Sequence, residues 1–147
     1  MKIALASDHR GFEFKNKIGT FISDLGHEVI DFGTSNGKDS VDYTDYGLEA
    51  ARSVSRGESD RAVLVCGTGL GMSLIANKVK GVRATVCHDL HTVEMSRRHN
   101  DANVLCLGAD VVDQGLLEKK INLWLETPFE GGRHARRVGK IMEAEGA

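Results

Sequence analysis

The stretch that most constrains the fold is AVLVCGTGLGMS, residues 62–73. An apolar run of strand length, residues 62–65, leads into Cys66, and helix-forming residues resume after the loop. The loop has a glycine at every second position: Gly67, Gly69 and Gly71. This order predicts a buried strand, a glycine loop and a helix start. Inward-facing amides and a helix N-terminus favour negative charge, so we expect an anion site here and a stabilised Cys66 thiolate.

Size and composition predict one compact domain with a hydrophobic core, covering residues 1–147. Of the 147 residues, 41% are hydrophobic and 27% are charged. A net charge of −2 argues against a nucleic-acid-binding protein. No apolar run reaches the ~18 residues of a membrane span. An odd number of cysteines, three, and an N-terminus that runs directly into a strand-like segment predict a reduced, cytoplasmic protein.

Apolar periodicity predicts strands that alternate with helices. The expected strands are residues 2–6, 28–32, 62–65, 82–87 and 103–107. The expected helices include Ile18 to Leu25, Tyr43 to Val54, Met72 to Val79, residues 91–99, Leu116 to Leu125, and a basic helix at about 131–145. This alternation favours a doubly wound α/β domain with a five-stranded parallel sheet between two helical layers. Ligands bind such sheets beyond the carboxyl ends of the strands, so Asp8 and His9 should lie beside Cys66.

The glycine loop admits three interpretations: a phosphate cradle, a dinucleotide-binding turn, or a tight turn without a ligand. Its spacing is GxGxG rather than GxGxxG, which disfavours a dinucleotide even though Asp89 lies at a suitable distance. No Lys-Ser/Thr pair ends the motif, which excludes a Walker loop. A cysteine phosphatase would need an arginine where Met72 stands, and a phospho-receiver would need a carboxylate in place of Cys66.

Other reactive side chains have both a functional and a structural interpretation. Cys87 and Cys106 lie in apolar strands and are interpreted as core residues. Thr68 could hold a proton or bind a substrate hydroxyl, or be a solvated loop residue. His99 could act as an acid or base, or be an ordinary surface histidine. His88, Asp89 and His91 could look like a metal site, but zinc would need a third and a fourth ligand that converge with them, so no metal is expected.

The segment GGRHARRVGK concentrates cations near the C-terminus, in a chain whose net charge is negative. In a helix, Arg133 and Arg137 lie one turn apart on one face and could grip a phosphate. A solvated basic face is the alternative.

Four separated motifs together resemble a known family. They are SDHRGF (7–12), CGTGLGMSLIANK (66–78), SRRHNDANVLCLG (96–108) and EGGRHARRV (130–138). In this order they resemble the type B ribose-5-phosphate isomerases, a group that includes galactose-6-phosphate and allose-6-phosphate isomerases, from Lys2 to about Ile141. The resemblance implies a Rossmann-like fold and an aldose–ketose isomerase without metal or cofactor. It also implies a homodimer, sometimes paired into a tetramer, with the active site between subunits.

The resemblance also implies roles for residues of this chain. Cys66 would move a proton between C1 and C2, Thr68 would assist proton exchange, and His99 would open the sugar ring. The remaining substrate-binding residues would be Asp8 and Tyr43 at the hydroxyls, the amides of Gly67, Gly69 and Gly71 with Ser73 at the enediolate oxygen, Asn100 beside His99, and His9, Arg133 and Arg137 at the phosphate. His99, Asn100 and both arginines would come from the partner subunit, on which the C-terminal helix would pack.

One position departs from the family pattern. Many members carry an arginine in the loop after the last strand, whereas this chain has Asp110. Arg10 and His88 are candidates to supply the missing cation at the phosphate. Two other functions stay open: a hexose-phosphate isomerase, and a non-catalytic module that binds a sugar phosphate.

Overall fold

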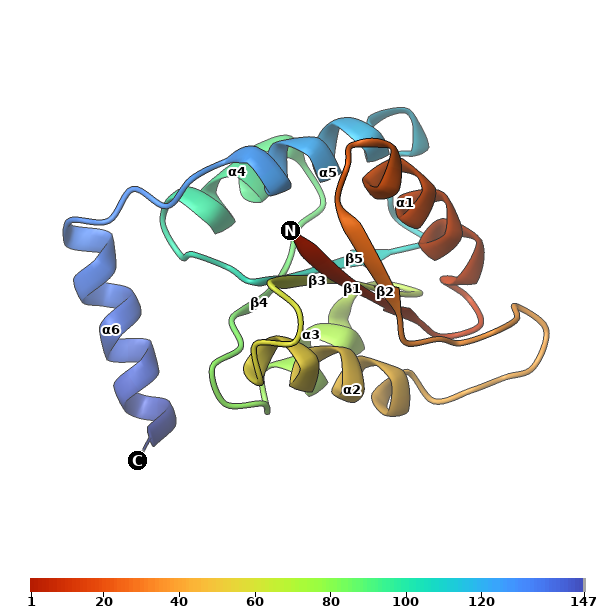
Figure 1. Ribbon diagram of the computed structural model, residues 1–147, viewed down its shortest axis with the longest axis horizontal. Coiled ribbons are helices and arrows are strands. Elements are labelled where there is room, and N and C mark those ends of the chain that lie inside the picture. The colour runs from red at the N-terminus through yellow and green to blue at the C-terminus, as the bar shows by residue number, and fades with distance from the viewer. Residues whose placement is uncertain (147) are drawn as a thin grey trace.

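Five short apolar runs form one parallel sheet in the computed structural model, which describes residues 1–146 (Figure 1). The strands are β1 (Lys2–Ser7), β2 (Glu28–Asp31), β3 (Arg61–Cys66), β4 (Ala84–Val86) and β5 (Val104–Gly108). Their order across the sheet is β2-β1-β3-β5-β4, and all four pairings are parallel. The central strands β1, β3 and β5 are buried almost throughout, as expected for a parallel sheet covered on both faces.

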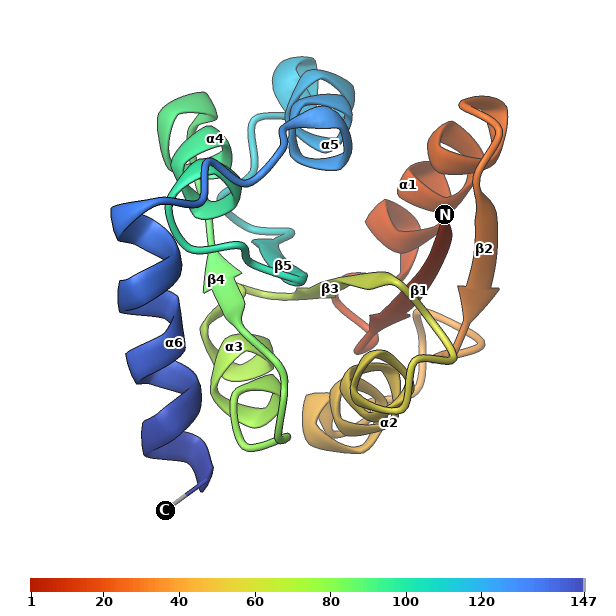
Figure 2. The same cartoon turned by 60° about the vertical axis from the view of Figure 1, so that its left-hand side comes forward.

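Helices cover both faces of this sheet (Figures 1 and 2). One layer holds α1 (Phe12–Asp24), α4 (Leu90–Arg98) and α5 (Leu117–Glu126), which follows a short 3-10 helix, Gln114–Leu116. The other layer holds α2 (Tyr43–Ser55) and α3 (Leu70–Ala76). The last helix, α6 (Arg133–Gly146), runs along the outside of the molecule near the β4 edge in both views. The doubly wound α/β architecture is therefore confirmed.

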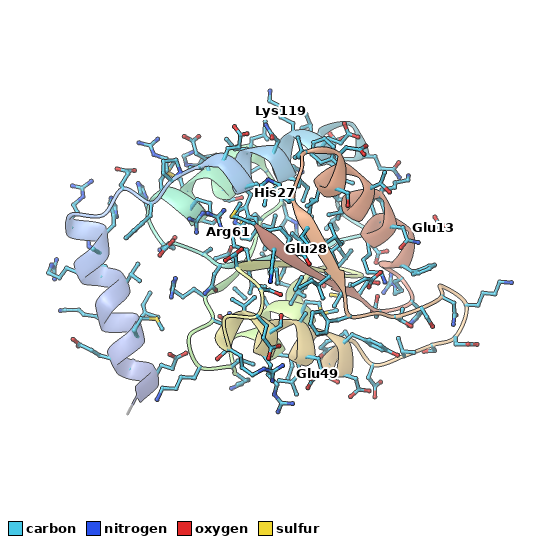
Figure 3. The ribbon with its side chains drawn as sticks, in the orientation of Figure 1. Glu13, His27, Glu28, Glu49, Arg61 and Lys119 are labelled. Carbon is cyan, nitrogen blue, oxygen red and sulfur yellow. The ribbon has the colours of Figure 1, made fainter. Side chains whose placement is uncertain are left out.

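Two apolar cores lie on the two faces of the sheet. Strand residues that point toward α1 and α5 are mostly large, and they pack around the fully buried Trp124. On the other face, the alanines of β1 and α2 bring helix and sheet close together around Met72. Charged side chains such as Glu13, Glu49 and Lys119 point outward from the helices (Figure 3). Alternating strand side chains thus fill both faces of the sheet.

The chain leaves β1 and β3 toward opposite helical layers, which makes their carboxyl ends the switch point of the sheet. The two strands pair directly, with Ser7 opposite Val65. Beyond Ser7, the Asp8 amide donates to the Val65 carbonyl at 3.2 Å. This confirms that Asp8 lies beside the end of the strand that carries Cys66.

The helix after the glycine loop differs from the sequence-based expectation. It begins at Leu70 and ends at Ala76, so Val79 lies outside it. Its buried face consists of Met72 and Ala76, whereas Leu74 is 66% exposed. The helix starts early because Gly69 adopts a positive φ of 83° and turns the chain directly into it. Leu70 and Leu74 of this short helix are thus left on the surface.

Strand β4 is also shorter than expected, because Val82, Arg83 and Cys87 lie outside it. It is an edge strand that pairs only with β5. No helix in residues 1–146 is long and apolar enough to cross a membrane.

The buried Lys15 joins three segments on the side of the sheet that α1 covers. The Nζ of Lys15 on α1 donates to both carboxylate oxygens of Asp31, at 2.8 and 3.0 Å, and to the Thr34 carbonyl at 2.6 Å. The Lys15 side chain is only 2% exposed, and its ammonium lies 5.1 Å from the centre of the Phe12 ring. Lys15 therefore ties α1 to the end of β2 and to the loop that follows.

We expect Lys15→Ala to lower the free energy of unfolding by about 2–4 kcal/mol, because the Thr34 carbonyl loses a buried donor and Asp31 loses its counter-ion. Lys17→Ala is the matched control, since Lys17 lies on the exposed face of the same helix and should cost under about 0.5 kcal/mol. Denaturant unfolding measures both variants. Equal effects would contradict a structural role for the buried ammonium.

Candidate functional site

Cys66 ends β3 with its sulfur under the glycine loop. The residue is 4% exposed, and the Gly69 amide donates to Sγ at 3.2 Å. A backbone donor aimed at the sulfur stabilises negative charge that collects there. Burial raises the pKa of the Cys87 thiol and, more strongly, that of Cys106. Both fit the interpretation as core residues.

At each glycine of the loop, a neighbouring group leaves no room for a side chain. A Cβ on Gly67 would lie 2.7 Å from Nη1 of Arg10, and one on Gly71 would lie 2.6 Å from the Tyr43 ring. Gly69 combines its positive φ with a close approach to the backbone of Leu107. The loop is therefore shaped for contacts with neighbouring segments as well as for its turn. Tyr43 lies directly against the start of α3.

The hydroxyls of Thr68 in the loop and Ser73 in α3 make opposite kinds of hydrogen bond. Thr68 is exposed, and its Oγ1 accepts the Leu70 amide proton at 3.3 Å. The Ser73 hydroxyl donates to the Leu70 carbonyl at 2.7 Å. The Thr68 proton is therefore free to be donated, whereas Ser73 can still accept.

Asp8 and His9 are oriented by backbone amides. One Asp8 oxygen, Oδ1, accepts from the amides of Arg10 and Gly11, each at 3.0 Å, so Oδ2 remains available. The Val41 amide donates to His9 Nδ1 at 3.2 Å. When neutral, the His9 ring then carries its proton on Nε2, which becomes a donor for a ligand oxygen.

The other predicted residues lie at the opposite edge of the sheet. His99 and Asn100 lie in the turn that leads from α4 to β5, and the first residue of β5, Val104, pairs with Ala62 near the start of β3. Cys66 pairs instead with Gly108, at the far end of both strands. Four residues of strand separate the two ends by about 13 Å. Within one chain, the structure thus does not bring His99 and Asn100 to Cys66.

A second cluster surrounds His99. Its ring stacks on that of His134 with centroids 4.0 Å apart and planes 8° apart, and Nε2 lies 3.5 Å from Oε2 of Glu130. The same Glu130 oxygen accepts from Nε of Arg98 at 2.9 Å. Burial lowers the pKa of His134, and the neighbouring His99 lowers it further. Arg133 and Arg137 are exposed on the first turns of α6, the helix that carries His134.

The side chain of Arg97 holds the turn after His99 in place through hydrogen bonds. Arg97, 5% exposed, donates through Nη1 to Oδ1 of Asp101 at 2.9 Å and to the Ala102 carbonyl at 2.6 Å. Asp101 adopts a φ of 46° and also pairs with Arg83. Asp101 therefore has a structural role, and Arg97 locks the backbone that presents His99.

The sequence motifs predict no role for His134 or Glu130. Both lie in the motif EGGRHARRV, whose composition is polar enough to hide the burial of His134. The one feature of the sequence that points to a role for these two residues is their position near Arg133 and Arg137, which are expected at the phosphate.

His99, Glu130 and His134 could each offer one metal-ligand atom, and these atoms lie within 4.8 Å of one another. The two imidazole planes are nearly parallel, however, so their lone pairs do not converge on one point as tetrahedral zinc requires. Asp89 has a structural role in this chain. It caps α4 by accepting the Thr92 amide at 2.7 Å, and this hydrogen bond lowers the Asp89 pKa.

A cavity of about 540 Å³ lies between α1 and α5, lined by residues such as Phe14, Phe21 and Leu117. It contains none of the predicted site residues.

The geometry defines an α/β protein with a glycine loop and a cysteine at the switch point of its sheet. The family model for Ribose/Galactose Isomerase matches residues 3–141. Ribose-5-phosphate isomerase B of Escherichia coli is 43% identical over 144 residues, covering 98% of this chain and 96% of that protein.

Two solved structures agree. Ribose-5-phosphate isomerase B of Clostridium thermocellum superposes with a TM-score of 0.96 at 52% identity, covering 99% of this chain and 98% of that one. The type B ribose 5-phosphate isomerase of Trypanosoma brucei gives a TM-score of 0.93 at 44% identity, with 97% of each chain covered. The chain therefore belongs to the ribose/galactose isomerase family.

Because of the contact between Gly71 and Tyr43, we expect the effect of Gly71→Ala on stability to change sign when the Tyr43 ring is removed. Alanine is favoured over glycine in a helix by about 1 kcal/mol, but here its Cβ would displace the Tyr43 ring. We expect Gly71→Ala to destabilise the wild type and to stabilise a Tyr43→Ala background. Thermal unfolding of the four proteins measures this. The same sign in both backgrounds would contradict the contact.

Proposed function

We propose that this protein interconverts D-ribose 5-phosphate and D-ribulose 5-phosphate, as an aldose–ketose isomerase of carbohydrate metabolism. The observation that carries this proposal is the Cys66 sulfur, held by the Gly69 amide at the mouth of the glycine loop. A non-catalytic sugar-phosphate binder would need phosphate and hydroxyl contacts but no base. The names of the E. coli and C. thermocellum relatives support the same activity.

In the proposed mechanism, Cys66 takes the proton from C2 of the open-chain aldose and returns it to C1. Loop amides between Gly67 and Gly71 stabilise the enediolate oxygen, apart from those of Gly69 and Leu70, which donate to Cys66 Sγ and Thr68 Oγ1. Each such donor is worth about 3 kcal/mol. Thr68, with its free hydroxyl proton, exchanges protons with the sugar oxygens. These steps require only groups of the protein, so the proposal includes no metal and no cofactor.

The remaining groups bind and prepare the substrate. Oδ2 of Asp8 and the Tyr43 hydroxyl contact sugar hydroxyls, with Ser73 as an acceptor near C1. His9 Nε2 donates to the phosphate. Holding the phosphate away from the reacting carbons lets binding energy align them with the sulfur.

We propose a homodimer in which each site is completed by the other subunit. His99 and Asn100, which lie beyond the opposite end of β5 from Cys66 in one chain, would arrive from the partner. Arg133 and Arg137 would come with them on the partner's α6 and bind the phosphate. A two-fold axis makes two identical sites from two such halves.

Exposed apolar side chains support this arrangement. Leu70 and Leu74 on α3 are 57% and 66% exposed, and Ile141 on α6 is 51% exposed. Only His134 and Val138 of α6 are buried within the chain. A second copy packed on α3 and α6 would cover this surface. Pairing of two dimers would give a tetramer.

A hexose-phosphate isomerase is the second candidate, because the matching family model is named for both ribose and galactose. Galactose 6-phosphate and allose 6-phosphate would use the same loop and base. We also propose a cytoplasmic location, supported by three cysteines that are all free thiols.

The test is a substrate panel on metal-stripped protein, with Cys66→Ala and a Cys87→Ala control. Ribose 5-phosphate should be converted rapidly by the wild type and by the control, because Cys87 is a core thiol. Cys66→Ala should lose at least about 1000-fold in kcat, the scale of removing a general base, and still bind the sugar phosphate.

Turnover of only a hexose phosphate would move the assignment to the second candidate. A Cys66→Ala variant that keeps more than about a tenth of kcat would refute the role of the thiol, since general-base catalysis contributes far more.

A further inference from the structure

We infer that Arg10 binds the phosphate of the substrate in this protein, and that Asp110 positions it; this rests on the proposed function. The Arg10 guanidinium forms an ion pair with the Asp110 carboxylate through Nη2 and Oδ2. The pair joins the loop after β1 to the loop after β5, on the two sides of the glycine loop.

The guanidinium lies directly against the residue that follows Cys66. A Cβ on Gly67 would be 2.7 Å from Nη1 and 2.9 Å from Cζ of Arg10, and 3.2 Å from Oδ2 of Asp110. Any side chain at position 67 would therefore displace this cation. The absence of a side chain there places a full positive charge next to the proposed oxyanion loop.

Both partners of the pair have a fixed backbone. The Arg10 amide donates to the buried Asp8 carboxylate at 3.0 Å. The Asp110 amide donates to the Gly67 carbonyl at 2.9 Å. The two side chains thus meet from anchored positions, which reduces the entropy lost when the guanidinium is used.

The pair leaves most of the guanidinium free. Arg10 has five N–H donors, and its hydrogen bond to Asp110 uses one on Nη2. The side chain is 54% exposed, so the remaining donors can reach a ligand. A phosphate accepts several charge-assisted hydrogen bonds from such a fork.

The same geometry explains how an anion is tolerated at position 110. An unpaired Asp110 carboxylate beside the phosphate would repel it, whereas the carboxylate bound to Arg10 is neutralised and orients the fork. His88, the other candidate cation, lies beyond β4 at the sheet edge, and its carbonyl accepts from the buried Lys120 at 2.8 Å. The cation is therefore assigned to Arg10.

The test compares Arg10→Ala, Arg10→Lys and Arg10→Ala/Asp110→Asn with the wild type. Arg52→Ala is the matched control, because Arg52 is similarly exposed and pairs with Glu49 on α2. Calorimetry gives the affinity for inorganic phosphate and for ribose 5-phosphate, and steady-state kinetics gives KM and kcat. Binding of the neutral sugar D-ribose reports whether the pocket is intact.

Arg10→Ala should weaken ribose 5-phosphate binding and raise KM about 10- to 100-fold, the scale of one charged hydrogen-bonding group. It should change kcat less than about threefold and leave D-ribose binding unchanged. Arg10→Lys should keep part of the affinity, and Arg52→Ala should keep all of it. The double variant should bind better than Arg10→Ala, because it no longer holds an unpaired carboxylate beside the phosphate.

An affinity for both phosphate ligands within threefold of wild type in Arg10→Ala would overturn the inference, as would an equal loss of D-ribose binding. A double variant that binds no better than Arg10→Ala would overturn the role of Asp110. A wild type that binds ribose 5-phosphate through Arg10 without converting it would refute the proposed function and leave this inference intact.

Discussion

The pairing of β3 with β5 is the constraint on which the rest of the site depends. This pairing fixes Cys66 at one end of the two strands, and it places the turn that carries His99 at the other. Because parallel strands share one direction, no loop movement within the chain brings the ends together. The chain therefore carries two separate clusters, one around the Cys66 sulfur and one with stacked histidines and cations.

The cluster around Cys66 is built by close approach of neighbouring segments to glycines. Tyr43 lies against Gly71, the Arg10 and Asp110 pair lies against Gly67, and the Thr68 backbone lies against Gly108. Three segments far apart in the sequence thus converge on one loop. Since each contact depends on a missing side chain, the loop could not be exchanged for a generic turn without moving its neighbours.

The sequence was sufficient to predict the sheet, its helical layers and the position of Asp8 beside the end of β3, because these depend on apolar periodicity and on the topology of parallel sheets. It did not predict the exposed face of α3. Leu74, Ile75 and Val79 were expected to carry this helix, but the turn at Gly69 starts it at Leu70 and it ends at Ala76, which leaves Leu74 on the surface. The stack of His99 on His134 was also not predictable, because it joins two polar segments whose contact depends on the path of residues 127–132. The roles of individual site residues stay predictions.

The measurement that tests the shared site most directly is activity of a mixed dimer. One copy carries Cys66→Ala and the other carries Arg133→Ala/Arg137→Ala; the two are co-expressed with different tags and purified through both. If sites are completed by the partner, each mixed dimer has one intact site, and its activity at low substrate should be about half that of the wild type. If each chain completes its own site, both sites of the mixed dimer are defective and it should be as inactive as its parents.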